Sequence, residues 1–145
     1  MFIGVNNHTV DIKGRLIVPH KFREELGFEF VVTRGMDKCL VAYPKSEWEK
    51  FAKKVNKLPI LSDSARGFVR FFFSEAAYCE TDRQGRIMIP QNLREYAGID
   101  KDIVIAGAIS KIEIWNKNDW EETTSNESID KDEIMGMMQE FGIRI

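Results

Sequence analysis

A duplicated motif constrains the fold of this 145-residue chain more than any other feature of its sequence. Residues 11–15 have the pattern D-x-x-G-R, and the same pattern returns 71 positions later at residues 82–86. In both places three apolar residues and a proline follow, so that the two stretches end at Pro19 and Pro90. A repeat of this kind indicates two versions of one small structural unit.

The correspondence between the two copies extends well beyond the motif. The offset of 71 holds as far as Gly27 and Gly98, and after one inserted residue an offset of 72 aligns Trp48 with Trp120. A unit of roughly 45 residues lies near the size below which a lone hydrophobic core is too small to fold. We therefore expect the two copies to complete one another in a shared core.

Each motif predicts a tight turn between two short strands. In the first copy these strands cover residues 8–12 and 15–18, which are rich in β-branched residues. An aspartate at the first position of the turn accepts hydrogen bonds from the turn backbone, and a glycine at the fourth position takes a positive φ without steric cost. We therefore expect two tight hairpins. Their turns would be shaped by Asp11, Gly14, Asp82 and Gly85.

The rest of each copy predicts short helices between short strands, which gives an α+β fold that is mainly β. In the first copy a helix follows Pro19 and ends near Gly27, strands cover residues 30–34 and 39–43, and a second helix begins at Pro44. The second copy repeats this order, with strands at residues 103–106 and 109–115.

Two further helices are predicted outside this pattern. Residues 62–74 follow a short linker, and the run Phe71–Phe73 is apolar nearly all round, which predicts burial on two sides, one of them against a second chain. Residues 130–141 form an amphipathic pattern with methionines on its apolar side. We expect that stripe to pack as core, although methionine-rich faces also adapt to partner surfaces.

Charge divides the chain into a basic body and an acidic tail. The formal net charge is −2, which argues weakly against binding to nucleic acid. Residues 119–140 hold eight acids and one base, whereas residues 1–118 hold 19 bases and 15 acids, a net of +4. An acidic tail therefore masks a mildly basic body. Charge alone leaves open whether both are simply solvated surfaces.

The sequence contains none of the common catalytic or metal-binding patterns. It has no G-x-S-x-G, H-E-x-x-H or phosphate-binding loop motif, its two cysteines are isolated, and its two histidines lack ligand spacing. We expect no catalytic residue, no metal, no cofactor and no small-molecule substrate. The start does not resemble a signal peptide, and no apolar run could span a bilayer. We therefore expect a cytoplasmic protein without a membrane partner.

The arginine of each motif is not explained by the geometry of the turn. A guanidinium group is a planar fork of donors that suits phosphates and guanine edges, and a two-stranded ribbon fits the major groove of DNA. Arg15 and Arg86 are therefore candidate DNA contacts, with Lys13 and Arg83 as flanking phosphate contacts. The alternative is a salt bridge to the aspartate of the same turn, but an exposed ion pair contributes little stability. Duplication and oligomerisation would each strengthen binding by raising the effective concentration of motifs.

Residues that carry a family resemblance lie in both halves: Met1, Phe2, Gly4, His8, Asp11, Lys13, Gly14, Arg15 and Pro19, then Phe73, Ser74, Ala76, residues 80–94, Ile112, Glu113, Trp115 and Trp120. They resemble the bacterial MraZ family over about residues 1–122. The resemblance implies tandem AbrB-type swapped-hairpin β-barrel modules that form an intramolecular pseudo-dimer. We expect module one at residues 5–47, a linker with helices at 48–75, module two at 76–119, and an acidic C-terminal segment at 120–145.

The resemblance also implies a function. MraZ proteins assemble into homo-oligomeric rings and are nucleoid-associated transcriptional regulators, which bind short G-rich direct repeats in the promoter of the division and cell-wall gene cluster that includes their own gene. The D-x-x-x-R signature of the family maps onto Asp11 with Arg15 and onto Asp82 with Arg86, which makes these arginines the inferred DNA contacts. We therefore predict a non-enzymatic, sequence-specific regulator that binds double-stranded DNA, with repression as the expected sign.

Two other functions are kept as alternatives. An antitoxin-like protein would bind its operator through the hairpins and hold a toxin through a C-terminal segment such as residues 130–141. A purely structural ring would bind protein and would not need the two arginines. The number of subunits, the base sequence that is read, the role of residues 123–145, and the pairing of hairpins within or between chains are left open by the sequence.

Overall fold

The order of helices and strands is the same in the two halves of the chain, as the repeat predicts. The computed structural model describes residues 1–144. Its first half contains β1 (Val5–Thr9), β2 (Arg15–Ile17), α1 (His20–Leu26), β3 (Glu29–Arg34), β4 (Leu40–Pro44), α2 (Lys45–Val55) and α3 (Asp63–Phe73). The second half contains β5 (Ala77–Glu80), β6 (Arg86–Met88), α4 (Gln91–Ala97), β7 (Asp102–Gly107), β8 (Ile112–Asn116), α5 (Lys117–Thr124) and α6 (Lys131–Glu140). The fold is thus mixed α+β, as expected.

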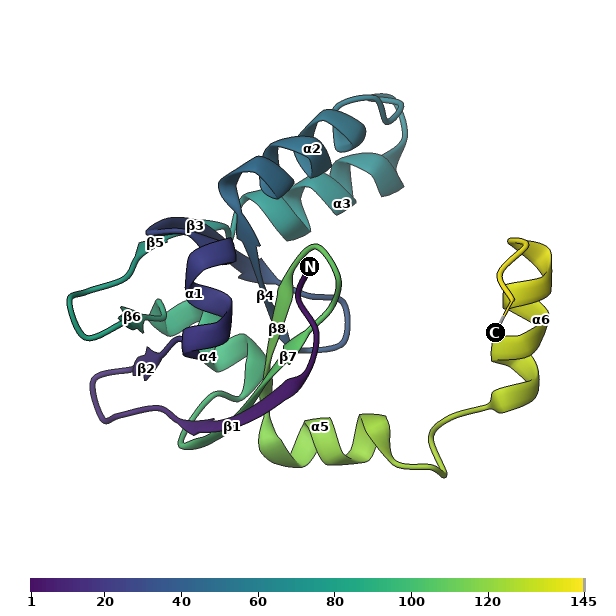
Figure 1. The fold of residues 1–145 in the computed structure, drawn as a ribbon. Helices are drawn as coiled ribbons and strands as arrows, with labels where there is room; N and C mark the ends of the chain where they lie inside the picture. Colours follow the sequence, from purple (N-terminus) through teal and green to yellow (C-terminus); the bar gives the residue numbers. More distant parts are fainter. Residues whose placement is uncertain (145) are drawn as a thin grey trace.

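The strands of the two halves are exchanged in one antiparallel sheet. Six strands follow the order β1-β7-β8-β4-β3-β5, and β2 and β6 form a separate two-stranded ribbon (Figure 1). The first strand of each half pairs with the other half, because β1 lies beside β7 and β5 lies beside β3. Exchanging the two halves maps this strand order onto itself. The chain is therefore a pseudo-dimer of two swapped-hairpin modules, which confirms the predicted fold class.

The tight turns form as predicted, but the two local hairpins do not. Asp11 N–H donates to the Arg15 carbonyl and Gly14 N–H to the Asp11 carbonyl, each at 2.9 Å, which closes the first turn. Beyond the turn, β1 pairs with β7 and β2 pairs with β6. Local pairing of the strands that flank each turn is therefore a wrong prediction. Exchange satisfies the same kind of backbone hydrogen bonds and also unites the apolar faces of both halves, and here it occurs within one chain.

The two halves share one hydrophobic core, as expected for units too small to fold alone. Leu16 and Ile87 of the ribbon lie in the same cluster as Phe30 and Ile105 of the large sheet, and none of these side chains is more than 2% exposed. Burying an aliphatic or aromatic side chain of this size contributes roughly 1.5–3 kcal/mol. The core therefore holds the ribbon against the sheet.

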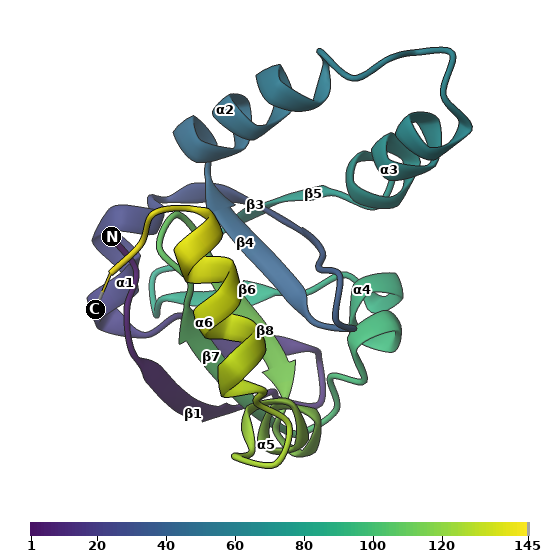
Figure 2. The ribbon, with the colours of Figure 1, turned by 90° about the vertical axis from the view of Figure 1, so that its right-hand side faces the viewer.

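Helices α2 and α3 form an antiparallel pair on one side of the large sheet (Figures 1 and 2). Their interface is aromatic, with ring centroids 4.7 Å apart for Trp48 and Phe73 and 5.7 Å apart for Phe51 and Phe72. The predicted helix at residues 62–74 is confirmed, and the Ser62 hydroxyl caps it by accepting the Ala65 N–H at 3.2 Å.

The aromatic run at the end of α3 is partly covered by its own chain. Phe72 is 8% exposed. The Arg34 guanidinium lies 4.3 Å from the centre of the Phe71 ring, and the edge of Tyr96 packs against the same ring at 6.0 Å. Groups of the same chain therefore account for the partial burial of Phe71, and a second chain on the rest of the run stays a hypothesis.

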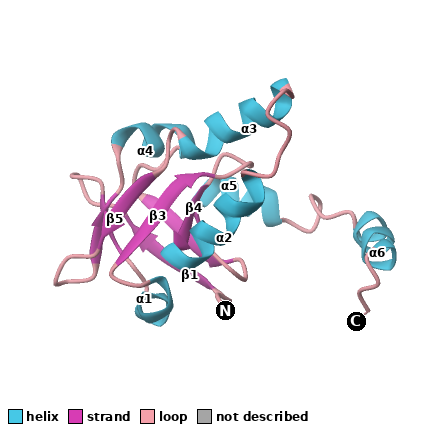
Figure 3. Ribbon diagram, turned by 90° about the horizontal axis from the view of Figure 1, so that it is seen from above, coloured by secondary structure: helices cyan, strands magenta, loops and turns pink. Residues whose placement is uncertain are grey.

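The C-terminal helix α6 stands apart from the rest of the molecule (Figures 1 and 3). It forms where the pattern predicts, but it contains no buried residue. The expectation that its methionine stripe packs as core is therefore wrong for this chain. No helix within residues 1–144 combines the length and the apolar character needed to cross a lipid bilayer.

Candidate nucleic-acid interface

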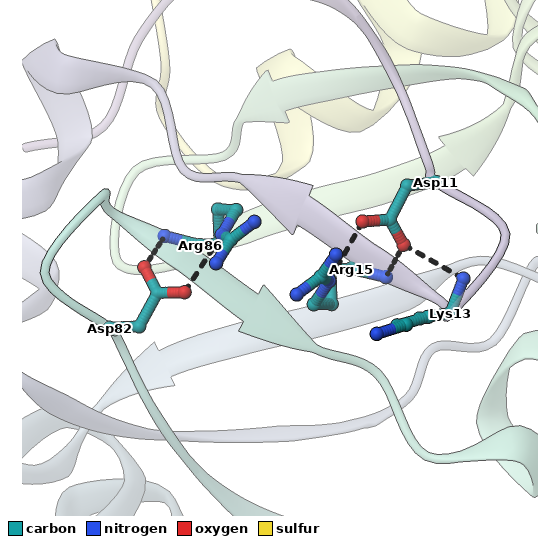
Figure 4. A network of polar contacts seen from close by, with 5 residues as sticks. All are labelled: Asp11, Lys13, Arg15, Asp82 and Arg86. Carbon is teal, nitrogen blue, oxygen red and sulfur yellow. Dashed lines mark hydrogen bonds and ion pairs between the residues drawn. The ribbon is translucent and has the colours of Figure 1, made fainter.

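The β2–β6 ribbon brings both predicted arginines to one exposed face. In its register Leu16 lies opposite Ile87, and both side chains point into the core with 2% exposure. Since successive side chains of a strand point to opposite faces, Arg15 and Arg86 point outward from the same ribbon. Figure 4 shows them on the two antiparallel strands. Residues 71 positions apart in the sequence are therefore neighbours on one surface.

Two exposed apolar side chains complete this outer face. Met88 lies directly opposite Arg15, and Ile17 lies directly opposite Arg86. Met88 is 58% exposed and Ile17 is 45% exposed. The side chains of Arg15 and Arg86 are each 28% exposed, so two partly exposed arginines alternate with two exposed apolar side chains on the outer face of the ribbon. We call Arg15, Ile17, Arg86 and Met88 the ribbon face.

Each arginine of the ribbon face is oriented by the aspartate that begins its turn. One carboxylate oxygen of Asp11 accepts the backbone N–H groups of Lys13 and Arg15, each at 2.9 Å, and the other accepts Arg15 Nε–H at 2.8 Å. Asp82 and Arg86 repeat this arrangement at the same distances. The predicted roles of both aspartates in the turns are therefore present in the geometry.

The same hydrogen bonds favour the ionised form of both aspartates. The backbone N–H of Arg15 is the largest cause of a lowered pKa for Asp11, and that of Arg86 plays the same part for Asp82. The side-chain bond from each arginine lowers the pKa further. Each turn thus presents a fixed carboxylate to the guanidinium beside it.

Both turns contain the ion pair that is the alternative role of the arginine, and this role is compatible with a DNA contact. Within residues 1–144, Nε is the only nitrogen of either guanidinium that bonds another protein group. The two terminal nitrogens of Arg15 and Arg86 are therefore available to a ligand. An arginine whose Nε is anchored in this way presents a pre-oriented fork of donors.

The flanking basic residues lie on the turns themselves. Lys13 and Arg83 are both exposed, one on each turn. They are not equivalent positions of the repeat, because Gln84 corresponds to Lys13 and Ile12 to Arg83. The structure thus adds one basic side chain at each end of the ribbon face.

The glycines of the two turns have a role beyond a positive φ. Gly14 and Gly85 have φ of 80° and 77°, as predicted for their turns. A Cβ at Gly14 would lie 2.5 Å from Cζ of Arg94, and one at Gly85 would clash with the guanidinium of Arg23. Each turn is therefore in close contact with an arginine from the other half of the chain.

These two arginines were not among the predicted site residues. Arg23 Nε donates to the Val18 carbonyl at 2.8 Å, and Arg94 Nε donates to the Ile89 carbonyl at 2.9 Å. Both side chains are half-buried. The repeat aligns Arg23 with Arg94 and so contained a signal, but their contacts with the opposite turns follow only from the exchange of strands.

Comparisons with known proteins agree with the internal repeat. The family model described as "MraZ protein, putative antitoxin-like" matches the chain twice, over residues 1–71 and 72–138. A protein named "Transcriptional regulator MraZ" from Caldicellulosiruptor bescii is 52% identical over 143 residues, which cover 99% of this chain and 100% of that protein. Proteins with the same name from Moorella thermoacetica and Lachnoclostridium phytofermentans are 49% and 53% identical, again over 99% of this chain and over 100% and 99% of their own lengths.

Proposed function

The chain belongs to the MraZ family, whose relatives named above are transcriptional regulators, and we propose that it regulates transcription by binding promoter DNA through the ribbon face. The observation that carries this proposal is the position of Arg15 and Arg86. Two arginines from distant parts of the sequence lie on one exposed face, each oriented by its own aspartate. An ion pair at a partly exposed surface contributes little to the stability of the fold, so stability alone does not account for the two arginines.

The chemistry of the ribbon face suits the major groove. A two-stranded antiparallel ribbon fits the width of that groove, and arginine donates in a bidentate manner to O6 and N7 of guanine. The exposed side chains of Ile17 and Met88 can contact the methyl group of thymine, which lies in the same groove. Lys13 and Arg83 would contact phosphates on either side. This division assigns base recognition to the ribbon and positioning to the turns.

One ribbon makes few contacts, so we propose that several chains act together. Each phosphate that a protein neutralises adds about −0.9 to the slope of log K against log salt, so a single ribbon has a shallow slope and a weak affinity. Chains that assemble into a ring can meet several direct repeats at once, which raises the effective concentration of each ribbon. The proposed target is the set of short direct repeats in the promoter of the division and cell-wall gene cluster that includes the chain's own gene, with repression as the outcome and with the nucleoid as the location.

The test is a binding titration of the full chain against DNA from its own promoter, across a series of salt concentrations. We expect Arg15→Ala and Arg86→Ala each to cost about 1–3 kcal/mol of binding free energy and to relax base specificity. Lys13→Ala and Arg83→Ala should weaken all sequences alike and reduce the salt slope by about 1 each. Lys50→Ala, which removes one exposed positive charge on α2, is the matched control.

Two outcomes of this titration would contradict the proposal. If a folded double variant that lacks both arginines still binds DNA like wild type, the ribbon face is not the DNA-binding surface. That result would favour the structural ring. A single isolated repeat that binds as tightly as an array would remove the need for several ribbons. Circular dichroism and sizing of every variant distinguish a lost contact from a lost fold.

The antitoxin-like alternative shares the DNA-binding face and differs at the C-terminal segment. The observation that favours it is the exposed helix α6, which has no buried side chain in the described part of the chain. It requires a second kind of protein in a stoichiometric complex. A purified preparation that contains this chain alone, and that binds promoter repeats with full affinity, would exclude that requirement.

A further inference from the structure

The helix α6 has the pattern of a helix that packs against another surface. Ile134 is 43% exposed, Met137 53% and Phe141 70%, and these residues recur at the spacing of one helical face. The helix has only ten residues and carries Gly136 in its interior. A helix of this length is marginal in water unless tertiary contacts support it. The apolar face of α6 would therefore be stabilised by packing against a partner surface.

The segment before α6 directs the helix away from its own molecule. The hydroxyl oxygens of Ser125 and Ser128 lie 2.8 Å apart and both lie within hydrogen-bond distance of the Glu122 carbonyl, and Ser128 N–H donates to the Ser125 carbonyl at 3.0 Å. This turn closes the end of α5 and fixes the path of the chain that leaves it. Figures 1 and 3 show α6 beyond this turn, separated from the sheet.

An apolar groove lies between α2 and α3, and it is open to solvent. Its deeper part has a volume of about 350 Å³ and is lined by Val55, Leu58, Ile60, Ala65 and Val69 among others. A second hollow of about 390 Å³ continues it along the same helices over Ala52 and Phe73. Ile60 is 79% exposed and Val69 is 39% exposed. We call this surface the α2–α3 groove.

The charges of the groove and of α6 are opposite. Residues 53–70 carry five bases and one acid, and the basic side chains of Lys53, Arg66 and Arg70 line the groove itself. Residues 127–141 carry five acids and one base. Opposite potentials of this kind guide two surfaces together and fix their register.

We propose that α6 of one chain docks into the α2–α3 groove of a second copy of this chain. The face that carries Ile134, Met137 and Phe141 covers the apolar floor, and the acids of α6 face the basic rim. The groove and the helix are different surfaces of one molecule, so the contact is head-to-tail, and repetition of such a contact closes into a ring or extends as a filament. This inference supplies the contact for the ring assembly proposed above, but it does not depend on DNA binding.

Two full-chain variants test the contact by sizing in the absence of DNA. Val69→Glu places a carboxylate in the groove against the acidic helix, and Ile134→Glu replaces the first apolar residue of the α6 face by a charged one. We expect each variant alone to run as a monomer while wild type assembles. Ser64→Glu on α3 and Gln139→Glu on α6 add the same charge off the two surfaces, and we expect both to assemble like wild type.

Mixing the two variants separates contact between chains from contact within one chain. The Val69→Glu chain keeps a normal α6, and the Ile134→Glu chain keeps a normal groove, so an equimolar mixture should form a species of twice the chain mass and no larger ring. Variants that assemble like wild type overturn the proposal and leave ring assembly through another surface intact. Monomeric variants that form no dimer on mixing also overturn it.

A pair of cysteine variants tests the same contact by disulfide cross-linking if Val69→Glu does not fold. A Val69→Cys chain mixed with a Met137→Cys chain should give a disulfide-linked dimer on a non-reducing denaturing gel, whereas each alone should give little. Burial raises the pKa of Cys39 to about 12 and that of Cys79 to about 11, so the native thiols contribute little background. The absence of a mixed dimer under oxidising conditions would overturn the proposal.

Discussion

At the scale of single residues, polar contacts around the two turns decide how the arginines are presented. Asp11 and Asp82 bind the backbone and the arginine of their own turns, while Arg94 and Arg23 pack against the turns from the other half. The first set of contacts is local in sequence and the second is not. Each candidate DNA contact is thus held by its own turn, and the turn is held by the opposite module.

The aspartates should make the stability of the fold depend on pH. Their pKa values are lowered in the folded chain, so they bind protons more readily when the chain is unfolded. Their contribution is complete above the ordinary aspartate pKa of about 3.9 and is lost as the pH falls through the lower folded values. We expect denaturation at pH 7 to show wild type more stable than the Asp11→Asn/Asp82→Asn variant, with the difference shrinking below about pH 4. An equal difference at every pH would contradict this, and Asp132→Asn controls for charge.

The contact between Gly14 and Arg94 should appear as coupling between two substitutions. Gly14→Ala strains a backbone with φ of 80° and displaces the Arg94 guanidinium from its hydrogen bond, so we expect a loss of about 1–3 kcal/mol. In an Arg94→Ala background the guanidinium is already gone, and Gly14→Ala should cost less by about 0.5 kcal/mol or more. Denaturant titration of the four proteins gives the coupling, and strict additivity would show that the two groups do not touch.

At the scale of elements, the ribbon of β2 and β6 divides stability and function between its two faces. Leu16 and Ile87 face the shared core, whereas Arg15, Ile17, Arg86 and Met88 face outward. The same three-residue strand therefore contributes one side chain to the core and two to the candidate interface. Substitutions on the two faces should have different consequences.

An identical change on each face tests this division. Ile87→Ala removes a core side chain that is 2% exposed and should cost about 2–4 kcal/mol of folding free energy. Ile17→Ala removes one that is 45% exposed and should cost under about 1 kcal/mol while weakening DNA binding. Denaturation and DNA titration of both variants provide the measurements. If the two variants lose the same folding free energy, the side chain of Ile17 must be buried in solution rather than exposed.

At the scale of the whole molecule, the exchange of strands makes each half depend on the other. β1 completes the sheet of the second half and β5 completes that of the first, and one core contains residues of both. Neither half can bury its apolar surface as an isolated monomer. The C-terminal helix α6 has an apolar face on which residues 1–144 bury no side chain.

Separate halves should therefore fold only by association. We expect a fragment of residues 1–75 to show concentration-dependent circular dichroism, since it must pair with a second fragment to replace the missing module. Dilution should unfold the fragment and leave the full chain unaffected. A fragment that stays folded and monomeric on dilution would show that one module has a sufficient core of its own.

The sequence alone determined the features that depend on neighbouring residues. The repeat predicted two equivalent modules, and aspartate and glycine at fixed positions predicted the turns, because the hydrogen bonds of a turn and the positive φ of its glycine involve only residues 11–15 or 82–86. The helices at residues 62–74 and 130–141 followed from the local periodicity of apolar residues. The arginines could be selected because the turns did not explain them.

Only the tertiary structure decided which strands pair and what each surface faces. A local hairpin and an exchanged strand use the same turn residues and the same kinds of backbone hydrogen bond, and the difference between them lies in how much apolar surface the two modules bury together. The exchanged pairing, which buries this shared apolar surface, places Arg15 and Arg86 on one ribbon. It also packs Arg94 against Gly14 and Arg23 against Gly85. It also left α6 exposed, since an amphipathic pattern states that a face is apolar but not which surface will cover it.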